Sequence, residues 1–406
     1  MTLSDEYLRA EQRNCFGDAQ EKLRETRRLN LYRCLRPASL DATNELNIGG
    51  RTIVDFSSND YLGLARHPRL AEAAAQAARR HGAGAGASRL ISGSRTIHSD
   101  LETGLAAWKG TSGALVFSSG YLANLGVVQA LSHRADGTHI PIFFDRLVHA
   151  SLIDAVRLSA SPWRTFRHND CERLERLLQR LQPSAASLSA LVITEGIFSM
   201  DGDLPPLADL LNLCERYNAL LILDDAHGTG TMGQGGHGTA DHAGVTGHPH
   251  LVQTGTLSKA LGSQGGFVSG PQVLMELLIN HSRAFIFDTA LAPPSAAAAL
   301  EALQILAAEP GRVAKLSSNL RRLRDNLRKG GLPIPDHPTP IVPVVLGDAA
   351  KAVAMAQQLE KAGFLTIAIR PPTVPAGSSR LRITVTATHT TQQIDQVSQE
   401  LMRAHG

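Results

Sequence analysis

The chain has 406 residues, of which 43% are hydrophobic and 19% are charged, a composition typical of a globular protein with a large core. Its 40 basic and 37 acidic residues leave a formal net charge of only +3, which gives no electrostatic reason to expect a nucleic-acid or membrane partner. The four cysteines are scattered without a CxxC pair, and the acidic N-terminal residues lack the apolar segment of a secretory signal. We therefore expect a cytoplasmic protein that binds neither nucleic acid nor a membrane.

The N-terminal part of the chain is rich in charge and leucine, and we expect residues 1–50 to form a helical segment. Alternating apolar residues predict a short strand over 51–56, and an alanine-rich stretch predicts a helix over 68–81. A glycine-rich loop follows at 82–86. It lacks the spacing of a dinucleotide-binding fingerprint and follows a helix rather than a strand, which argues against an NAD site.

The middle of the chain repeats one pattern, in which an apolar run of strand length ends in a polar, glycine-rich turn. The runs lie at residues 114–117, 191–194, 220–223 and 251–254. Continuous apolar runs suit strands that are buried on both faces, as in parallel sheets. A helical pattern over 207–217 separates the second run from the third and completes a βαβ unit. We therefore predict an α/β fold, with a large and mostly parallel-sheet domain over residues 51–294.

The last third of the chain differs in character and predicts a smaller α+β domain over residues 295–406. An alanine-rich helix over 295–308 is too short and too mild to span a bilayer. A basic helix and a proline-rich connector follow at 321–328 and 333–343. Strand patterns and helical patterns then complete the domain, the strands at 341–346, 364–369 and 381–386 and the helices at 349–362 and 391–404.

Reactive side chains follow three of the apolar runs. One run is followed by Glu195, the next by Asp224 and His227, and the third by Lys259. Because ligands of open α/β sheets bind beyond the carboxyl ends of the strands, these groups are expected at one edge. A lysine amine forms Schiff bases and commonly holds pyridoxal phosphate, whose ring nitrogen stays protonated beside a carboxylate such as Asp224. Taken singly, each residue is better explained as a surface, turn or structural residue.

A phosphate-binding turn is predicted where the run at 114–117 ends. Ser119, Gly120 and Tyr121 begin a helical segment, so their backbone N–H groups and nearby hydroxyls of Thr256 and Thr289 could hold a phosphate. His149 also follows a strand-like run and could stack on the cofactor ring. The P-loop spacing is absent.

A histidine cluster in a later glycine-rich stretch is a weaker signal. It has no HExxH motif and no cysteine partner, so we favour a solvated loop over a metal site and expect no metal. The cluster consists of His237, His242, His248 and His250.

Three ordered motifs resemble those of the α-oxoamine synthases. They are Phe56-Ser57-Ser58-Asn59-Asp60-Tyr61-Leu62-Gly63-Leu64, Asp224-Asp225-Ala226-His227-Gly228-Thr229-Gly230 and Thr256-Leu257-Ser258-Lys259. The family consists of fold-type I pyridoxal-phosphate enzymes, acyltransferases that condense an amino acid with an acyl thioester and release carbon dioxide. The runs at 369–377 and 380–387 look like those of members that use L-alanine and a pimeloyl thioester in biotin biosynthesis.

The resemblance implies a role for each matching position. Lys259 would anchor the cofactor and move the α-proton, Asp224 would pair with the pyridinium nitrogen, and His149 would stack on the ring. The other implied cofactor contacts are His227, Ser199, Ser119, Gly120, Tyr121 and Thr256, with Thr289 reaching the phosphate in the neighbouring subunit. The implied substrate contacts are Asn59, Arg370, Thr373 and Arg33. The family also implies a homodimer with active sites at the subunit interface.

Several alternatives remain open at this point. The acyl donor could be pimeloyl-CoA or pimeloyl-acyl carrier protein, and the chain could be another α-oxoamine synthase such as 2-amino-3-ketobutyrate CoA ligase. A more distant alternative is a serine or threonine acyl-enzyme hydrolase built on Ser119 or Thr256. A relative that binds a partner without catalysis is the third.

Overall fold

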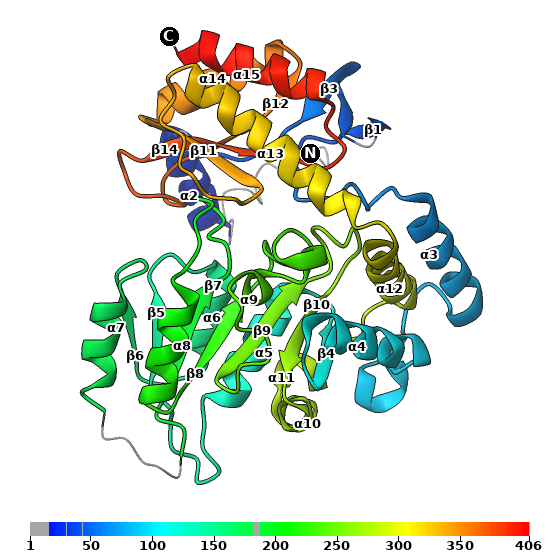
Figure 1. The fold of residues 1–406 in the computed structure, drawn as a ribbon, viewed down its shortest axis with the longest axis vertical. Helices are drawn as coiled ribbons and strands as arrows, with labels where there is room; N and C mark the ends of the chain where they lie inside the picture. The colour runs from blue at the N-terminus through cyan, green and yellow to red at the C-terminus, as the bar shows by residue number, and fades with distance from the viewer. Residues whose placement is uncertain (1–15, 30, 43, 182–186, 406) are drawn as a thin grey trace, which may run out of the picture.

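The structure is a computed structural model that describes residues 16–29, 31–42, 44–181 and 187–405. A seven-stranded sheet with strand order β4-β10-β9-β8-β7-β5-β6 forms the centre of the lower half in Figure 1. The strands are β4 (Gly113–Phe117), β5 (Ile142–Asp145), β6 (Trp163–Phe166), β7 (Ala190–Glu195), β8 (Ala219–Asp224), β9 (Leu251–Thr256) and β10 (Gly266–Gly270). The four apolar runs predicted as strands are confirmed as β4, β7, β8 and β9.

The central sheet is mostly parallel and is buried on both faces. Strands β6, β5, β7, β8 and β9 run parallel to one another, and β10 pairs antiparallel with both β9 and β4. Along β7, Leu191 and Ile193 pack into one hydrophobic core, whereas Ala190 and Val192 pack into another. Since successive side chains of a strand point to opposite faces, an unbroken apolar run is what such a position requires.

Helices cover the two faces and one end of this sheet. Those of the first core are α5 (Gly120–Leu131), α6 (Ala150–Leu158), α10 (Gln272–His281) and α11 (Arg283–Ile286). Those of the second are α7 (Cys171–Leu178) and α8 (Leu207–Arg216), so the predicted βαβ unit is confirmed. A third core joins α3 (Pro68–His81), α4 (Thr96–Lys109) and α12 (Pro293–Ala308). Short turns of helix complete the domain at η2 (Arg89–Gly93), η3 (Gln234–Gly236) and α9 (Thr239–His242).

The C-terminal part forms a separate core around a three-stranded antiparallel sheet, β11-β14-β13. Its elements are α13 (Gly311–Lys329), β11 (Ile341–Gly347), α14 (Ala349–Lys361), β13 (Ile367–Ile369), β14 (Ser379–Thr384) and α15 (Thr391–His405). The single strand predicted over 364–369 is wrong, because the chain changes sheets within it. Phe364–Leu365 forms β12, which pairs parallel with β3, whereas β13 pairs with β14.

The N-terminal segment differs from the helical segment predicted through residue 50. Helix α2 spans Gly17–Arg28, and residues 1–15 lie outside the described part. Strands β1 (Ser39–Ala42) and β2 (Glu45–Ile48) then form a hairpin that pairs with β3 (Arg51–Asp55). Through β3 and β12 this hairpin joins the C-terminal part, at the top of Figure 1. We therefore propose that residues 39–56 belong to the C-terminal domain rather than to the large one.

Within the described residues, no helix combines the length and the apolar character needed to cross a bilayer. The same part of the chain contains no group of three or more His, Cys, Asp or Glu side chains placed to hold a metal ion.

Candidate active site

The predicted reactive groups meet at the carboxyl edge of the central sheet. Parallel pairing sets Glu195 of β7 beside Asp224 of β8, and Asp224 beside Thr254 of β9. Glu195, Asp224 and Lys259 line a cavity of about 240 Å³. The lining consists of Ser119, Gly120, Tyr121, Asn124, His149, Ser151, Glu195, Asp224, Ala226, His227, Thr256, Ser258 and Lys259. It therefore includes every cofactor-contacting residue predicted from the sequence except Ser199 and Thr289.

Asp224 is a buried acceptor that is held at both of its oxygens. Asn124 Nδ2 donates to Asp224 Oδ2 at 2.7 Å, and the Ala226 backbone N–H donates to Oδ1 at 3.0 Å. Asn124 is itself oriented by Thr254, whose hydroxyl donates to Asn124 Oδ1 at 2.6 Å. A carboxylate oriented in this way on the floor of a cavity suits a cationic ring nitrogen. Asn124 was not predicted as a site residue.

Lys259 has the properties of an amine nucleophile. Its Nζ lies 2.9 Å from His227 Nε2. Burial lowers the pKa of Lys259 to about 8, although the carboxyl groups of Asp224 and Glu195 act in the opposite direction. The lowered pKa increases the unprotonated fraction of the amine near neutral pH, and Schiff-base chemistry requires this form.

His227 belongs to a buried chain of polar contacts that leads away from Lys259. Burial, reinforced by the positive charges of Lys259 and Arg382, holds the pKa of His227 well below its usual value, so the imidazole is neutral. Its Nδ1 lies 2.7 Å from the Tyr61 hydroxyl, which donates to Asn59 Oδ1 at 3.2 Å. Because the Tyr61 proton is used in that bond, we assign the imidazole proton to Nδ1, which leaves Nε2 as the acceptor for Lys259.

Arg382 of β14 completes this chain from the C-terminal domain. Its Nη2 donates to Asn59 Oδ1 at 3.1 Å and to the Tyr61 oxygen at 3.4 Å. Neither Tyr61 nor Arg382 was predicted as a site residue. The available signal was the alternation of Arg380 and Arg382 with Leu381 and Ile383, which sets two cations on one face of a buried strand.

Glu195 is a second carboxyl group in the cavity, with a different protonation state. Its side chain is buried, and burial together with the charge of Asp224 raises its pKa well above the usual value. Among the described residues, its Oε1 has no hydrogen-bond partner. Burial and the neighbouring charge therefore favour the protonated form of Glu195, which can donate a hydrogen bond inside the cavity.

The N-terminus of α5 forms a cradle for an anion. Ser119 caps this helix, its Oγ accepting from the Leu122 N–H at 3.2 Å. The Thr256 and Ser258 hydroxyls lie 2.7 Å apart beside it. The turn is closely packed, because a Cβ on Gly266 would lie 2.4 Å from the Gly120 nitrogen. Backbone N–H groups at a helix N-terminus, with hydroxyls nearby, are the groups that bind phosphate.

Six predicted residues lie outside the cavity lining, and one of them is Asn59, whose Oδ1 accepts from Tyr61 and Arg382. The Ser199 carbonyl accepts from Arg382 Nε at 2.6 Å, and Arg370 is half-buried in the segment after β13. The side chains of the remaining three are exposed, namely Arg33, Thr289 and Thr373. Their roles stay predictions.

Comparison with known proteins agrees with this geometry. Residues 51–401 match the family model of class I and II aminotransferases. A serine palmitoyltransferase from S. paucimobilis, solved in complex with pyridoxal phosphate and myriocin, superposes with a TM-score of 0.87 at 29% identity, over 96% of this chain and 97% of that one. The chain therefore belongs to the class I and II aminotransferase family, with the fold-type I architecture and pyridoxal phosphate as its cofactor.

Two further relatives place the chain within that family. The 8-amino-7-oxononanoate synthase of Trichlorobacter lovleyi is 44% identical over 385 residues, which cover 94% of this chain and 96% of that protein. The crystal structure of 8-amino-7-oxononanoate synthase from Francisella tularensis superposes with a TM-score of 0.74 at 26% identity, over 86% of this chain and 97% of that one. Within its family the chain thus belongs with the 8-amino-7-oxononanoate synthases. The predicted family, fold class and cofactor are confirmed.

The residues present fit pyridoxal phosphate. Lys259 would hold the cofactor aldehyde, Asp224 the ring nitrogen, and the N-terminus of α5 the phosphate. Within the described part of the chain, the buried Glu195 Oε1 has no hydrogen-bond partner, and the turn at Gly120 is tightly packed; both features fit a cavity that holds a polar ligand.

Proposed function

We propose that the chain catalyses the decarboxylative condensation of L-alanine with a pimeloyl thioester, which yields 8-amino-7-oxononanoate, carbon dioxide and the free thiol carrier in biotin biosynthesis. The observation that carries the proposal is the connected set Lys259, His227, Tyr61 and Arg382 beside the buried Asp224. The 44% identity to an 8-amino-7-oxononanoate synthase supports the choice of product.

Each of these side chains has a task in such a reaction. When bound, pyridoxal phosphate supplies an electron sink for the charge left at the α-carbon of the amino acid. Lys259, with its pKa near 8, accepts the α-proton and returns a proton to the same carbon. Neutral His227 keeps the amine in place through Nε2 without adding a charge to the cavity. Asn59 and Arg370 are the proposed contacts of the substrate carboxylate, and Thr373 of the acyl group.

We further propose a homodimer in which Thr289 reaches the cofactor phosphate of the partner subunit. Thr289 lies close to the exposed Phe287, and the Ala290 N–H donates to the Ala87 carbonyl at 3.0 Å, which brings this segment beside η2. Ile91 of η2 is 81% exposed and Phe287 is 69% exposed. Large apolar side chains exposed together are typical of an interface. Replacing Ile91 by Asp should produce monomers in analytical ultracentrifugation and weaken pyridoxal-phosphate binding, whereas an unchanged dimer would count against this surface.

A mass-spectrometric product assay tests the reaction. Alanine, glycine and serine are each combined with acetyl, succinyl, pimeloyl and palmitoyl thioesters, with pimeloyl offered both on coenzyme A and on acyl carrier protein. Alanine with a pimeloyl donor should give 8-amino-7-oxononanoate as the main product. Preferred turnover of glycine with acetyl-CoA would identify a 2-amino-3-ketobutyrate ligase instead.

The Lys259→Ala variant is the control for the chemistry. It should lose both turnover and the yellow colour of the bound cofactor, and a coloured, fully active variant would contradict the assignment. An acyl-enzyme mechanism is disfavoured by the geometry of the two candidate hydroxyls. Ser119 Oγ caps a helix, and Thr256 Oγ1 donates to the Gly265 carbonyl at 3.0 Å.

A further inference from the structure

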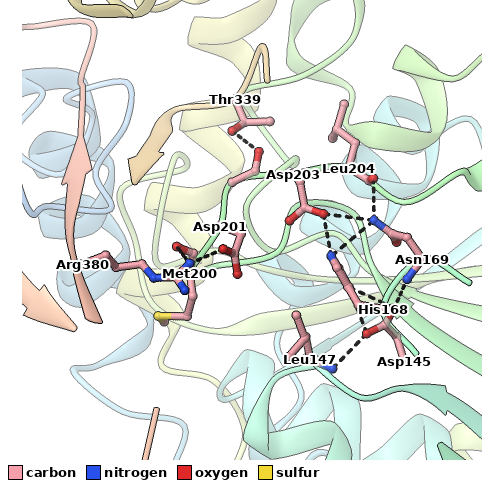
Figure 2. Close-up of polar contacts among 11 residues, drawn as sticks. Asp145, Leu147, His168, Asn169, Met200, Asp201, Asp203, Leu204, Thr339 and Arg380 are labelled. Carbon is pink, nitrogen blue, oxygen red and sulfur yellow. Dashed lines mark hydrogen bonds and ion pairs between the residues drawn. The ribbon is translucent and has the colours of Figure 1, made fainter. Parts of the chain in front are cut away.

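A histidine outside the cavity is bonded to a carboxylate on each side, and Figure 2 shows it between them. His168 Nδ1 lies 3.1 Å from both oxygens of Asp145, and His168 Nε2 lies 2.6 Å from Asp203 Oδ2. Only the imidazolium can donate from both ring nitrogens. Burial lowers the pKa of His168, but the hydrogen bonds to Asp145 and Asp203 outweigh it and raise the pKa to about 10.

The first carboxylate shapes the turn that leads to His149. Asp145 is the last residue of β5, and its Oδ1 accepts from the Leu147 N–H at 2.9 Å. Its Oδ2 accepts from the Asn169 N–H at 2.8 Å. His149, which lines the cavity, comes two residues after Leu147 and caps α6. The position of this cap therefore depends on Asp145.

The second carboxylate belongs to the loop between β7 and α8. We call residues 196–204 the Ser199 loop. The Phe198 N–H donates to the Asp203 carbonyl at 3.0 Å, and the buried Phe198 ring meets the His168 ring edge-on at 4.4 Å. Asn169 Nδ2 also donates to Asp203 Oδ2 at 3.0 Å. His168 thus contacts this loop through both a charge and a ring.

The far side of the Ser199 loop is bonded to the C-terminal domain. Thr339 Oγ1 donates to the Gly202 carbonyl at 2.6 Å, and Arg380 forms an ion pair with Asp201, as Figure 2 shows. Arg382 Nε donates to the Ser199 carbonyl, while its Nη2 bonds Asn59 and Tyr61 beside the cavity. A displacement of the loop would therefore move Arg382, and with it the contacts that lead to His227 and Lys259.

We propose that His168 is a positioning residue for the reaction. It is a cation that joins the turn before His149 to the Ser199 loop and so fixes the positions of His149 and Arg382 relative to Lys259. The inference concerns the site of the proposed function, but its main readout, cofactor affinity, does not depend on which substrates are used. The charged groups that the structure places against the ring are Asp145 from β5 and Asp203 from the Ser199 loop. A glutamine at position 168 would lose the charge and one of the two contacts.

The test compares the His168→Gln holoenzyme with wild type and with His281→Gln, which changes an exposed histidine on α10. Pyridoxal-phosphate dissociation constants come from visible absorbance titrations, and kcat and KM for alanine come from the product assay, all well below the melting temperature. We expect His168→Gln to weaken cofactor affinity and kcat/KM each roughly 10- to 100-fold, the scale of a small displacement of reacting groups. His281→Gln should match wild type.

A second variant keeps the proposal testable if His168→Gln does not fold. Asp203→Asn removes one charged contact and leaves the imidazole in place, and it should weaken cofactor affinity in the same direction. His168→Arg, which restores a cation able to reach both carboxylates, should recover part of the loss. A variant that lowers only the melting temperature, with wild-type cofactor affinity and KM, would overturn the positioning role. Absence of condensation by wild type would instead refute the proposed function and leave the affinity comparison intact.

Discussion

Breaking the buried ion pair behind the cavity should destabilise the protein strongly. Lys109 Nζ lies 2.8 Å from Asp225 Oδ2 and 2.7 Å from the His237 carbonyl, and both charged side chains are 0% exposed. Asp225 also accepts from the Thr239 N–H at 3.2 Å. In Lys109→Met the Asp225 charge would stay buried without its partner, which costs about 3–5 kcal/mol in comparable cases.

A double-mutant cycle measures this coupling. Asp225→Asn alone should cost a similar amount, because it leaves the Lys109 charge buried. The combination Lys109→Met with Asp225→Asn removes both charges and keeps an acceptor for Thr239, so its loss should be much smaller than the sum of the two single losses. We expect a coupling of at least about 3 kcal/mol.

Urea titrations of the holoenzyme at one protein concentration supply the free energies of unfolding, provided that cofactor absorbance and far-UV circular dichroism report the same transition. The matched control is Arg322→Met. Arg322 and Asp395 are 2.6 Å apart, but their side chains are 45% and 33% exposed, so this change should cost only about 0–1 kcal/mol. Additive single losses of the size of the control would refute the reasoning.

Three further predictions concern the cavity. Gly266→Ala places a methyl group 2.4 Å from the Gly120 nitrogen and should weaken pyridoxal-phosphate binding about tenfold or more. Its control is Gly270→Ala on the same strand, where the methyl group first meets the end of the Leu274 side chain at 3.3 Å, and this variant should bind the cofactor as wild type does. Equal dissociation constants for the two variants would contradict this prediction. Tyr61→Phe leaves His227 Nδ1 without its partner, so the activation free energy should rise by about 1–3 kcal/mol and kcat should fall accordingly. A wild-type kcat in steady-state kinetics would argue against a role for this contact. The pKa of Lys259 is lowered to about 8, and only the neutral amine is nucleophilic. The rate at which the apoenzyme captures pyridoxal phosphate should therefore increase as pH rises toward 8 and level off above it. A stopped-flow rate that is flat from pH 6 to 9 would disprove this.

The parts of the fold predicted correctly are those with a strong local signal. Four apolar runs identified strands of the central sheet because a strand buried on both faces needs no polar position. The prediction of a single strand over 364–369 failed because local pattern does not determine which sheet a strand joins. Five of these residues are extended, but whether they join one sheet or two is decided by β3 and β14, which lie far away in sequence. Local pattern contains no information about such partners.

The site residues that were predicted also had a local sequence signal, whereas the roles of those that were missed depend on distant parts of the chain. Asp224 and Lys259 each end or follow an apolar run, so the topology of a parallel sheet predicts their meeting. Asn124 and Tyr61 carry no comparable signal, because each is defined by a contact with a residue 100 or more positions away. Arg382 is a strand residue whose relevance depends on the C-terminal domain meeting the Ser199 loop, which no single segment indicates.

Two adjacent aspartates show how the environment decides chemistry in this protein. Asp224 and Asp225 follow each other at the end of β8, yet their side chains contact different partners. Asp224 faces the cavity, where Asn124 and a backbone N–H hold it for a cofactor, whereas Asp225 bonds Lys109 and the Thr239 N–H on the other side. The Thr229 N–H donates to the Asp225 carbonyl at 2.8 Å, so the turn that carries His227 is anchored at Asp225. The ion pair with Lys109 therefore stabilises the backbone from which both Asp224 and His227 reach the cavity, and this is why we expect its loss to lower cofactor affinity as well as stability.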